Sequence, residues 1–318
     1  MTRAASPLMA TTASAYSRTI LLVATMERRV FDADPFAPES KVVYFNEAAA
    51  EPWGKPNEVT TNIASVTRFR YPDRDRQIQV VLCAEGHVGF FGKEEGFYEK
   101  IAVAGLHAED ARGYGYMNMI RQIGAPLYAC GGGGQIYKRV APGDWRSVDE
   151  AMLAAGRDLI FEDVNGPHEE SLYLVGQRGS AYWKGKGPFQ DMGLPTSVWL
   201  NRILVEDEKN VWICGDKGTL LRGNHIDGFR EAAPAGGETF LSMAQFEGRI
   251  YLASATGLYV LERGRISRVR ATLEPELYDA HILDAVDGVL WSIGYRDIAR
   301  FDGRVWQRLD LPGNPPIR

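Results

Sequence analysis

The chain has 318 residues, of which 45% are hydrophobic and 24% are charged. These values are typical of a globular protein, and the length allows two average domains or one large all-β domain. The formal net charge is −5 with both signs interspersed, so the composition predicts no nucleic-acid partner. No apolar run is long enough to span a bilayer, and we expect no membrane partner.

The N-terminal segment is rich in Ala, Ser and Thr. We expect residues 1–15 to form a disordered tail, followed by a single domain at 16–318. The first apolar block, TILLVAT at 19–25, lacks a basic leader and a small-residue cleavage site, so no signal peptide is predicted. Three cysteines are too far apart for a C-x-x-C pair: Cys83, Cys130 and Cys214. Free thiols of this kind are typical of a reducing compartment, and we expect a cytoplasmic protein.

Six segments of the chain share one pattern, an apolar run, four turn residues and a second apolar run. They read VVLCAEGHVGFF, LYACGGGGQIYK, LYLVGQRGSAYW, VWICGDKGTLLR, IYLASATGLYVL and LWSIGYRDIARF. The fourth turn residue stands at positions 87, 134, 179, 218, 257 and 297, so the intervals are 47, 45, 39, 39 and 40 residues. Further strand-like segments flank both runs and are joined by Gly, Asp and Asn turns. This spacing predicts four short antiparallel strands in each unit.

Four-stranded units that recur every 40 to 45 residues or so are typical of a β-propeller, in which neighbouring sheets cover each other's faces. Six such blades are predicted between about residues 62 and 312, and the segment 18–48 supplies strands for another. We therefore predict an all-β protein, a propeller of seven four-stranded blades. Six blades with an N-terminal extension is the alternative. The segment 147–158 predicts a short helix with a cap at Ser147 or Asp149.

The four glycines in YACGGGGQIYKR occupy the turn that GQRG and GDKG fill in other units. A phosphate-binding Walker loop would need Gly-Lys and then Ser or Thr, and a dinucleotide motif would need glycine where Ile136 stands. The stretch therefore predicts a tight turn, and we expect no cofactor.

The cysteines align with Val175, Ala253 and Ile293 of other units, which predicts that they occupy core positions. The five histidines show no metal-ligand spacing, so no metal site is predicted.

A hydrophobic run, G-x-x-G, a second run and then x-x-x-D-G-x-W/F recur along most of the chain, most clearly at 211–231 and 172–191. This pattern resembles the degenerate propeller repeats of bacterial proteins, described as WD-repeat, YVTN or BNR-like and related to photosystem-assembly propellers. The resemblance implies the architecture. Propellers of this kind serve as binding scaffolds and as immunity proteins. No catalytic constellation stands out in the sequence, which favours a non-catalytic scaffold that binds another protein. The resemblance implies a sharper form of this hypothesis, an immunity or accessory protein that blocks a bacterial toxin or effector.

A ligand site is predicted where the innermost strands begin, on the face where propellers most often bind ligands. Its candidate residues are Asn118, Asn201, His281, Arg68 and Arg121. The alternative is that these side chains only fasten strand ends by hydrogen bonds. A second hypothesis for function stays open, a small-molecule binder or a lyase or hydrolase in which His281 works with a channel carboxylate such as Asp284.

Two long connections, 48–61 and 107–116, exceed what joining blades requires and are predicted to carry recognition. Aromatic residues are favoured as anchors of protein interfaces. The predicted partner-binding residues, in these connections and at strand starts, are Trp53, Tyr114, Tyr116, Trp199 and Tyr278.

Overall fold

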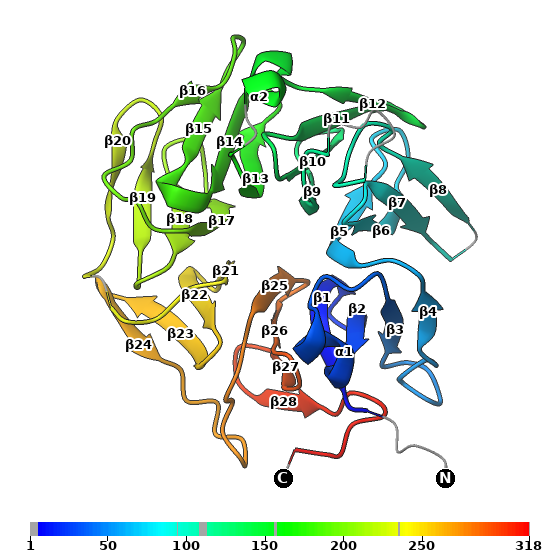
Figure 1. The fold of residues 1–318 in the computed structure, drawn as a ribbon. Coiled ribbons are helices and arrows are strands. Elements are labelled where there is room, and N and C mark those ends of the chain that lie inside the picture. The colour runs from blue at the N-terminus through cyan, green and yellow to red at the C-terminus, as the bar shows by residue number, and fades with distance from the viewer. Residues whose placement is uncertain (1–5, 94, 108–112, 156–157, 235, 318) are drawn as a thin grey trace. The chain divides into compact units, whose positions relative to one another are not determined.

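The protein's structure, a computed structural model, describes residues 6–93, 95–107, 113–155, 158–234 and 236–317. Within these residues the strands form seven antiparallel sheets, each made of four strands that follow one another along the chain (Figure 1). The chain is therefore an all-β protein, a seven-bladed β-propeller. The prediction of seven blades is confirmed, and the alternative of six blades is wrong. The chain divides into two compact units, which we call unit 1 and unit 2.

Unit 1 comprises Met1–Ile63 and Ser242–Arg318. Its first sheet contains β1 (Leu8–Ser17), β2 (Ile20–Glu27), β3 (Ser40–Asn46) and β4 (Asn57–Val59), with the helix α1 (Arg28–Ala33) between β2 and β3. Its second sheet contains β21 (Ser242–Phe246), β22 (Arg249–Ser254), β23 (Gly257–Glu262) and β24 (Arg265–Arg268). Its third sheet contains β25 (Ile282–Val286), β26 (Val289–Ile293), β27 (Ile298–Phe301) and β28 (Trp306–Leu309).

Unit 2 comprises Ala64–Leu241 and holds the other four sheets, of which the first begins at the boundary residue. Two of them contain β5 (Ile63–Arg70), β6 (Gln77–Cys83), β7 (His87–Phe91) and β8 (Gly96–Lys100), and β9 (Met117–Gln122), β10 (Leu127–Gly131), β11 (Ile136–Ala141) and β12 (Asp144–Ser147). The other two contain β13 (Phe161–His168), β14 (Ser171–Gly176), β15 (Ala181–Lys184) and β16 (Gln190–Asp191), and β17 (Leu200–Val205), β18 (Val211–Gly215), β19 (Leu220–Asn224) and β20 (Gly228–Glu231). Two short helices, α2 (Glu150–Ala155) and η1 (Gln177–Gly179), complete the unit.

The burial of each strand follows its place in the sheet. The second strand of a blade is covered on both faces, so it needs a continuous apolar run, as β18 shows with all its residues buried. The outermost strand, such as β20, is mostly exposed. Hydrophobic clusters lie between neighbouring sheets of the same unit, for example around Phe90 and Tyr137, or around Phe45 and Trp291. This gradient explains why the second strands gave the clearest repeats.

The N-terminal segment differs from the prediction. Residues 8–15 belong to β1 and are not a disordered tail, whereas residues 1–5 lie outside the described part of the chain. Ala10, Ala13 and Ala15 are buried in a cluster with Trp291 of β26. The small side chains that suggested disorder instead allow β1 to lie close to the neighbouring sheet. Packing against that sheet orders the strand despite the weak strand propensity of alanine and serine.

The four-glycine stretch is a tight turn between β10 and β11, as predicted. Gly133 has φ +66°, and an added Cβ there would lie 2.3 Å from the carbonyl oxygen of Tyr114. Gln135, fully buried beside the turn, donates to the carbonyl of Gly115 at 2.8 Å and accepts from the amide of Gly105 at 3.0 Å. The turn therefore needs glycine for close backbone contact as well as for its conformation.

The cysteines occupy the core, as their alignment predicted, since Cys83, Cys130 and Cys214 are all buried. Burial raises the pKa of the Cys214 thiol to about 12, which keeps it protonated and unreactive at neutral pH.

The predicted helix at 147–158 is also confirmed as α2, and Asp149 caps it by accepting the amide of Met152 at 3.0 Å. No helix in the described ranges has the length and apolar character needed to cross a membrane.

Candidate protein-binding surfaces

Asn118 and Asn201 both bond to a backbone carbonyl of a later segment of unit 2. Asn118, on β9, donates its side-chain amide to the carbonyl of Phe161 at 2.9 Å, where β13 begins. Asn201, on β17, donates to the carbonyl of Phe240 at 2.9 Å. Two equivalent positions thus make equivalent bonds, which is what the strand-fastening alternative describes. A ligand that bound either side-chain amide would have to replace its hydrogen bond to a backbone carbonyl.

Arg121 belongs to a buried ion pair that joins three strands. Its Nη2 atom donates to both carboxylate oxygens of Asp163 on β13, each at 3.0 Å, and Asp163 also accepts the amide of Ile203 on β17 at 2.9 Å. Asp163 is fully buried, so these charge-assisted bonds offset the cost of removing its charge from water. Arg121 therefore holds blades together within unit 2. Arg68, on β5, belongs to the same unit.

His281 and Asp284 belong to unit 1, and each is held by a different neighbour. His281 precedes β25, is only 8% exposed, and stacks on the ring of Tyr295 with 4.4 Å between the ring centres. Asp284, on β25, accepts the amide of Ala15 at 3.0 Å and the hydroxyl of Ser14 at 3.2 Å. The carboxylate thus ties β25 to β1. The histidine is packed against an aromatic ring, which is a poor arrangement for open acid–base work.

The predicted aromatic anchors divide into packed and exposed residues. Trp53 is half-buried, and its ring lies 5.0 Å from that of Phe45 in the core of unit 1. Residues 48–61 are thus no free insertion, because 57–59 form β4. By contrast Trp199 is 40% exposed and Tyr278 is 43% exposed.

Trp199 and Tyr116 lie just before the innermost strands β17 and β9 of unit 2. Burial raises the pKa of Glu162, and a hydrogen bond from the Trp199 side chain acts in the opposite direction. Tyr114 and Tyr116 are half-buried beside the four-glycine turn, whereas the preceding residues 108–112 of this connection lie outside the described residues. Unit 2 therefore presents aromatic side chains at the starting ends of two inner strands.

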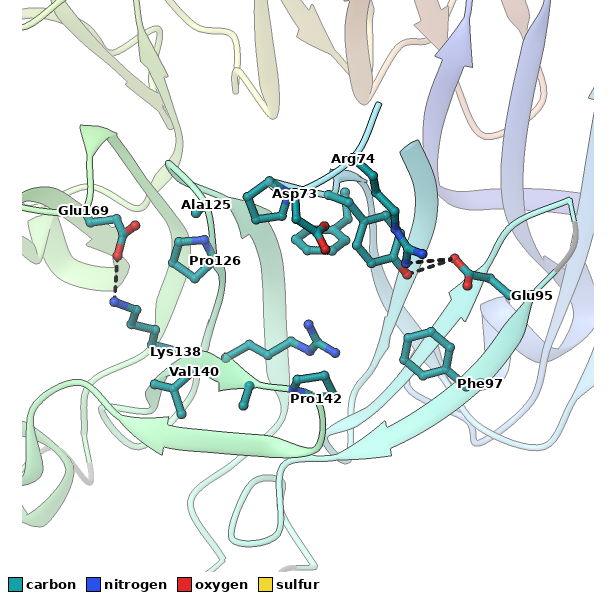
Figure 2. Close-up of a pocket in the computed structure, with 15 residues that line it drawn as sticks. Asp73, Arg74, Glu95, Phe97, Ala125, Pro126, Lys138, Val140, Pro142 and Glu169 are labelled. Carbon is teal, nitrogen blue, oxygen red and sulfur yellow. Dashed lines mark hydrogen bonds and ion pairs between the residues drawn. The ribbon is translucent and has the colours of Figure 1, made fainter. Parts of the chain in front are cut away.

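A groove of about 800 Å³ opens near the C-terminal end of β9, between the sheets β5–β8 and β9–β12 (Figure 2). It is lined by the turns that join the first two and the last two strands of each sheet. Its apolar walls are formed by Tyr71, Pro72, Phe97, Pro126, Val140 and Pro142. Sequence reasoning made no prediction for these proline-containing segments. The turn between the first and second strands and the turn between the third and fourth strands lie at the same end of an antiparallel blade. The predicted strand order could therefore have placed these turns together.

Most charged groups of the groove contact one another. Tyr71 donates its hydroxyl to Glu95 at 2.9 Å, and the guanidinium of Arg74 lies 3.8 Å from the centre of the Tyr71 ring. Arg76 is 3.5 Å from the same glutamate. Burial, together with the bond to Glu95, raises the pKa of the Tyr71 hydroxyl, so it stays a donor. One carboxylate thus organises this side of the groove.

Arg139 is the most enclosed cation of the groove. Its Nε donates to Glu99 at 2.9 Å, and Trp145 donates its indole N–H to the same carboxylate at 2.9 Å. The guanidinium also lies over Phe90, 4.8 Å from the ring centre. Burial acts to raise the pKa of Glu99, but these hydrogen bonds outweigh it and hold the pKa below its ordinary value. On the other side Lys138 pairs with Glu169 at 2.6 Å.

Comparison with known proteins identifies one curated relative and many folds of the same kind. No family model matches the chain. The chain is 36% identical over 201 residues to the immune protein Tsi7 of Pseudomonas aeruginosa, and the match covers 62% of this chain and 65% of the relative. The matched region thus spans slightly less than two thirds of that protein.

Solved structures share the fold of this chain. The WD40 propeller domain of Doa1 has a TM-score of 0.61 at 8% identity, with 93% of this chain and 95% of that chain covered. YCF48, solved with a D1 peptide, has a TM-score of 0.62 at 12% identity, with 92% of each chain covered. At such low identity these likenesses concern the fold alone. Together with the seven sheets, they show that the chain is a β-propeller built from degenerate repeats.

Proposed function

We propose that the chain is an immunity protein, a non-catalytic scaffold that binds a toxin and blocks it. The observation that carries this proposal is the 36% identity to an immune protein over 201 residues. A match of that length extends over several blades, so it reflects more than one shared repeat. The resemblance of the repeats to those of bacterial propellers supports the same conclusion.

The engagement of the inner polar side chains also supports a binding role. Asn118 and Arg121 bond to β13, Asn201 bonds to the backbone of Phe240, and Asp284 bonds to β1. Side chains bound in this way maintain a rigid scaffold, and a rigid scaffold lowers the entropy cost of binding a protein partner.

For the partner surface we propose the aromatic residues at the starting ends of the inner strands in unit 2, with Trp199 as its main anchor. The buried free thiols suit a reducing compartment, and we propose that the protein acts in the cytoplasm.

The proposal is tested in the protein's own cells. Deleting its gene should make those cells sensitive to the parental strain in a growth competition, and an intact copy on a plasmid should restore resistance. Affinity purification of the tagged chain should recover one partner protein in an equimolar complex. A deletion strain that competes as well as its parent would contradict the immunity function.

The surface is tested with paired variants of unit 2. Trp199→Ala should weaken capture of the partner by about tenfold or more, as expected for a central aromatic anchor. The matched control is Tyr98→Ala, which removes an aromatic side chain that is 75% exposed on β8. Equal loss in both variants, or no loss in either, would exclude Trp199 as the anchor.

A further inference from the structure

One stretch of unit 1 departs from the mixed charge of the rest of the chain. Residues 263–270 read RGRISRVR and contain four arginines and no acidic residue, although the protein as a whole has a net charge of −5. The stretch includes β24, the outermost strand of its sheet. All four arginines are exposed. We refer to residues 263–270 as the arginine edge.

Most cations of the arginine edge are not balanced within the protein. Among the described residues, the side chains of Arg263, Arg265 and Arg270 make no hydrogen bond or ion pair. Two nearby glutamates, Glu262 and Glu276, are engaged elsewhere. Glu262 pairs with Arg249 at 3.2 Å, and Glu276 accepts the amides of its own loop. The positive charge of the edge is therefore directed to solvent.

The fourth arginine fixes the strand in place. Arg268 donates from Nη2 to the carbonyl of Leu277 at 3.2 Å. It also lies so close to Gly257 that an added Cβ there would sit 3.0 Å from the same nitrogen. These contacts hold β24 against β23 and the following loop. Arg265 is thus presented from an ordered strand, with Arg263 in the turn before it and Arg270 two residues after the strand ends.

The backbone of β24 offers a second means of recognition. The strand pairs with β23 through the register Tyr259↔Arg268 to Glu262↔Arg265, and on its other side it pairs with no strand among the described residues. Charged side chains commonly protect such edges from aggregation. Protection alone does not require charges of one sign, because any charge disfavours pairing with an apolar strand. A uniformly positive edge selects an acidic strand.

We propose that the arginine edge binds an extended acidic segment of the partner protein, which adds to β24 as a fifth strand. The proposal rests on the proposed function for the identity of that partner. A polypeptide fits better than a nucleic acid, since only a polypeptide supplies N–H and C=O groups to an open sheet edge. Alternate residues of a strand face opposite sides, so Arg265 and Arg268, three residues apart at the two ends of β24, lie on opposite faces of the strand. The bound segment should therefore carry acidic residues on both of its faces.

The test uses a synthetic probe, so it does not depend on knowing the toxin. The probe is a fluorescent ten-residue peptide with glutamates on both faces of the extended strand, and binding is followed by fluorescence anisotropy. The full chain should bind it, and the double variant Arg265→Glu/Arg270→Glu should bind about tenfold more weakly or worse, because like charges repel. The control Arg230→Glu/Arg304→Glu makes the same charge change at exposed positions on β20 and after β27, and it should bind like the parent.

Backbone pairing is tested separately from charge. Peptides N-methylated at alternate residues lose the amide donors of one edge only, so one of the two methylated forms should lose binding and the other should keep it. If both bind like the parent peptide, strand addition is wrong. Equal binding by the two double variants, or tighter binding of a ten-nucleotide single-stranded DNA than of the peptide, would also overturn the proposal. None of these results alters the growth competition that tests immunity.

Discussion

The groove of unit 2 and the arginine edge of unit 1 are both rich in cationic side chains, but within the described ranges these side chains are paired with carboxylates only in the groove. In the groove Arg139 bonds to Glu99, Lys138 to Glu169, and Arg76 lies beside Glu95. At the arginine edge three of four arginines make no such contact among the described residues. The count of positive charges therefore does not distinguish a structural cation from one that is available to a partner. The burial of each cation and the presence of a neighbouring carboxylate distinguish the two.

The largest effect is expected where a buried pair in the groove is broken. Glu99→Gln leaves the charge of Arg139, whose side chain is only 10% exposed, without a counterion. Removing one partner of a buried ion pair costs about 3 to 5 kcal/mol of unfolding free energy. Urea unfolding followed by tryptophan fluorescence should show a much lower midpoint than the parent. A midpoint unchanged from the parent would mean that solvent already compensates Arg139, and the contrast between the two regions would fail.

A buried carboxyl without a guanidinium partner should respond to pH in the opposite sense from Glu99. Burial raises the pKa of Asp279 in unit 1 from 3.8 to about 6, although it accepts backbone amides such as that of Tyr295. Between these values the folded state keeps a proton that the unfolded state releases, so stability falls as pH rises from about 4 to 6. Glu99, whose pKa is lowered, instead stabilises the fold above its ordinary pKa and loses that contribution in acid.

Asp279→Asn should remove the loss of stability between pH 4 and pH 6, which is expected to be about 1 to 3 kcal/mol. The measurement is the urea midpoint at several pH values for the parent and the variant. A parent whose stability rises steadily through this range, with the variant parallel to it, would show that Asp279 ionises normally.

A smaller effect is expected at the rim of the groove. Lys138 and Glu169 form a 2.6 Å pair, but the two side chains are 34% and 35% exposed. Partly exposed pairs contribute about 0.2 to 1 kcal/mol and are screened by salt. Lys138→Ala should therefore lower the urea midpoint slightly, and the difference from the parent should shrink in 1 M sodium chloride. A difference that is unaffected by salt would point to packing of the lysine stem instead.

The smallest effect on stability is expected at the arginine edge. Arg265→Ala/Arg270→Ala removes charges that make no contact in the described protein, so the unfolding free energy should change by less than about 0.5 kcal/mol. The same variant should weaken binding of the acidic peptide. Loss of stability together with binding would mean that these arginines support the fold, and the distinction from the groove would disappear.

The repeats predicted most of the fold because turn chemistry and burial act locally. A hairpin turn needs glycine near the same position in each blade, and a strand covered on both faces needs a continuous apolar run, so both leave a regular trace. β1 left no such trace. Its sequence, LMATTASAYS, has weak strand propensity, and it is ordered by packing of its small side chains near Trp291. The repeat pattern also did not indicate that the ring of Trp53 packs on that of Phe45.

The sequence by itself determined the propeller fold, the hairpin turns and the core cysteines, because each depends on contacts within one repeat. Only the tertiary structure decided which polar residues are bound and which are presented. Arg121 and Arg265 look alike in sequence, but Arg121 meets Asp163 of the next blade, whereas Arg265 stands on an open edge. Partners 40 residues apart are brought together by stacking of blades, and the free energy of a charge depends on whether that partner is present.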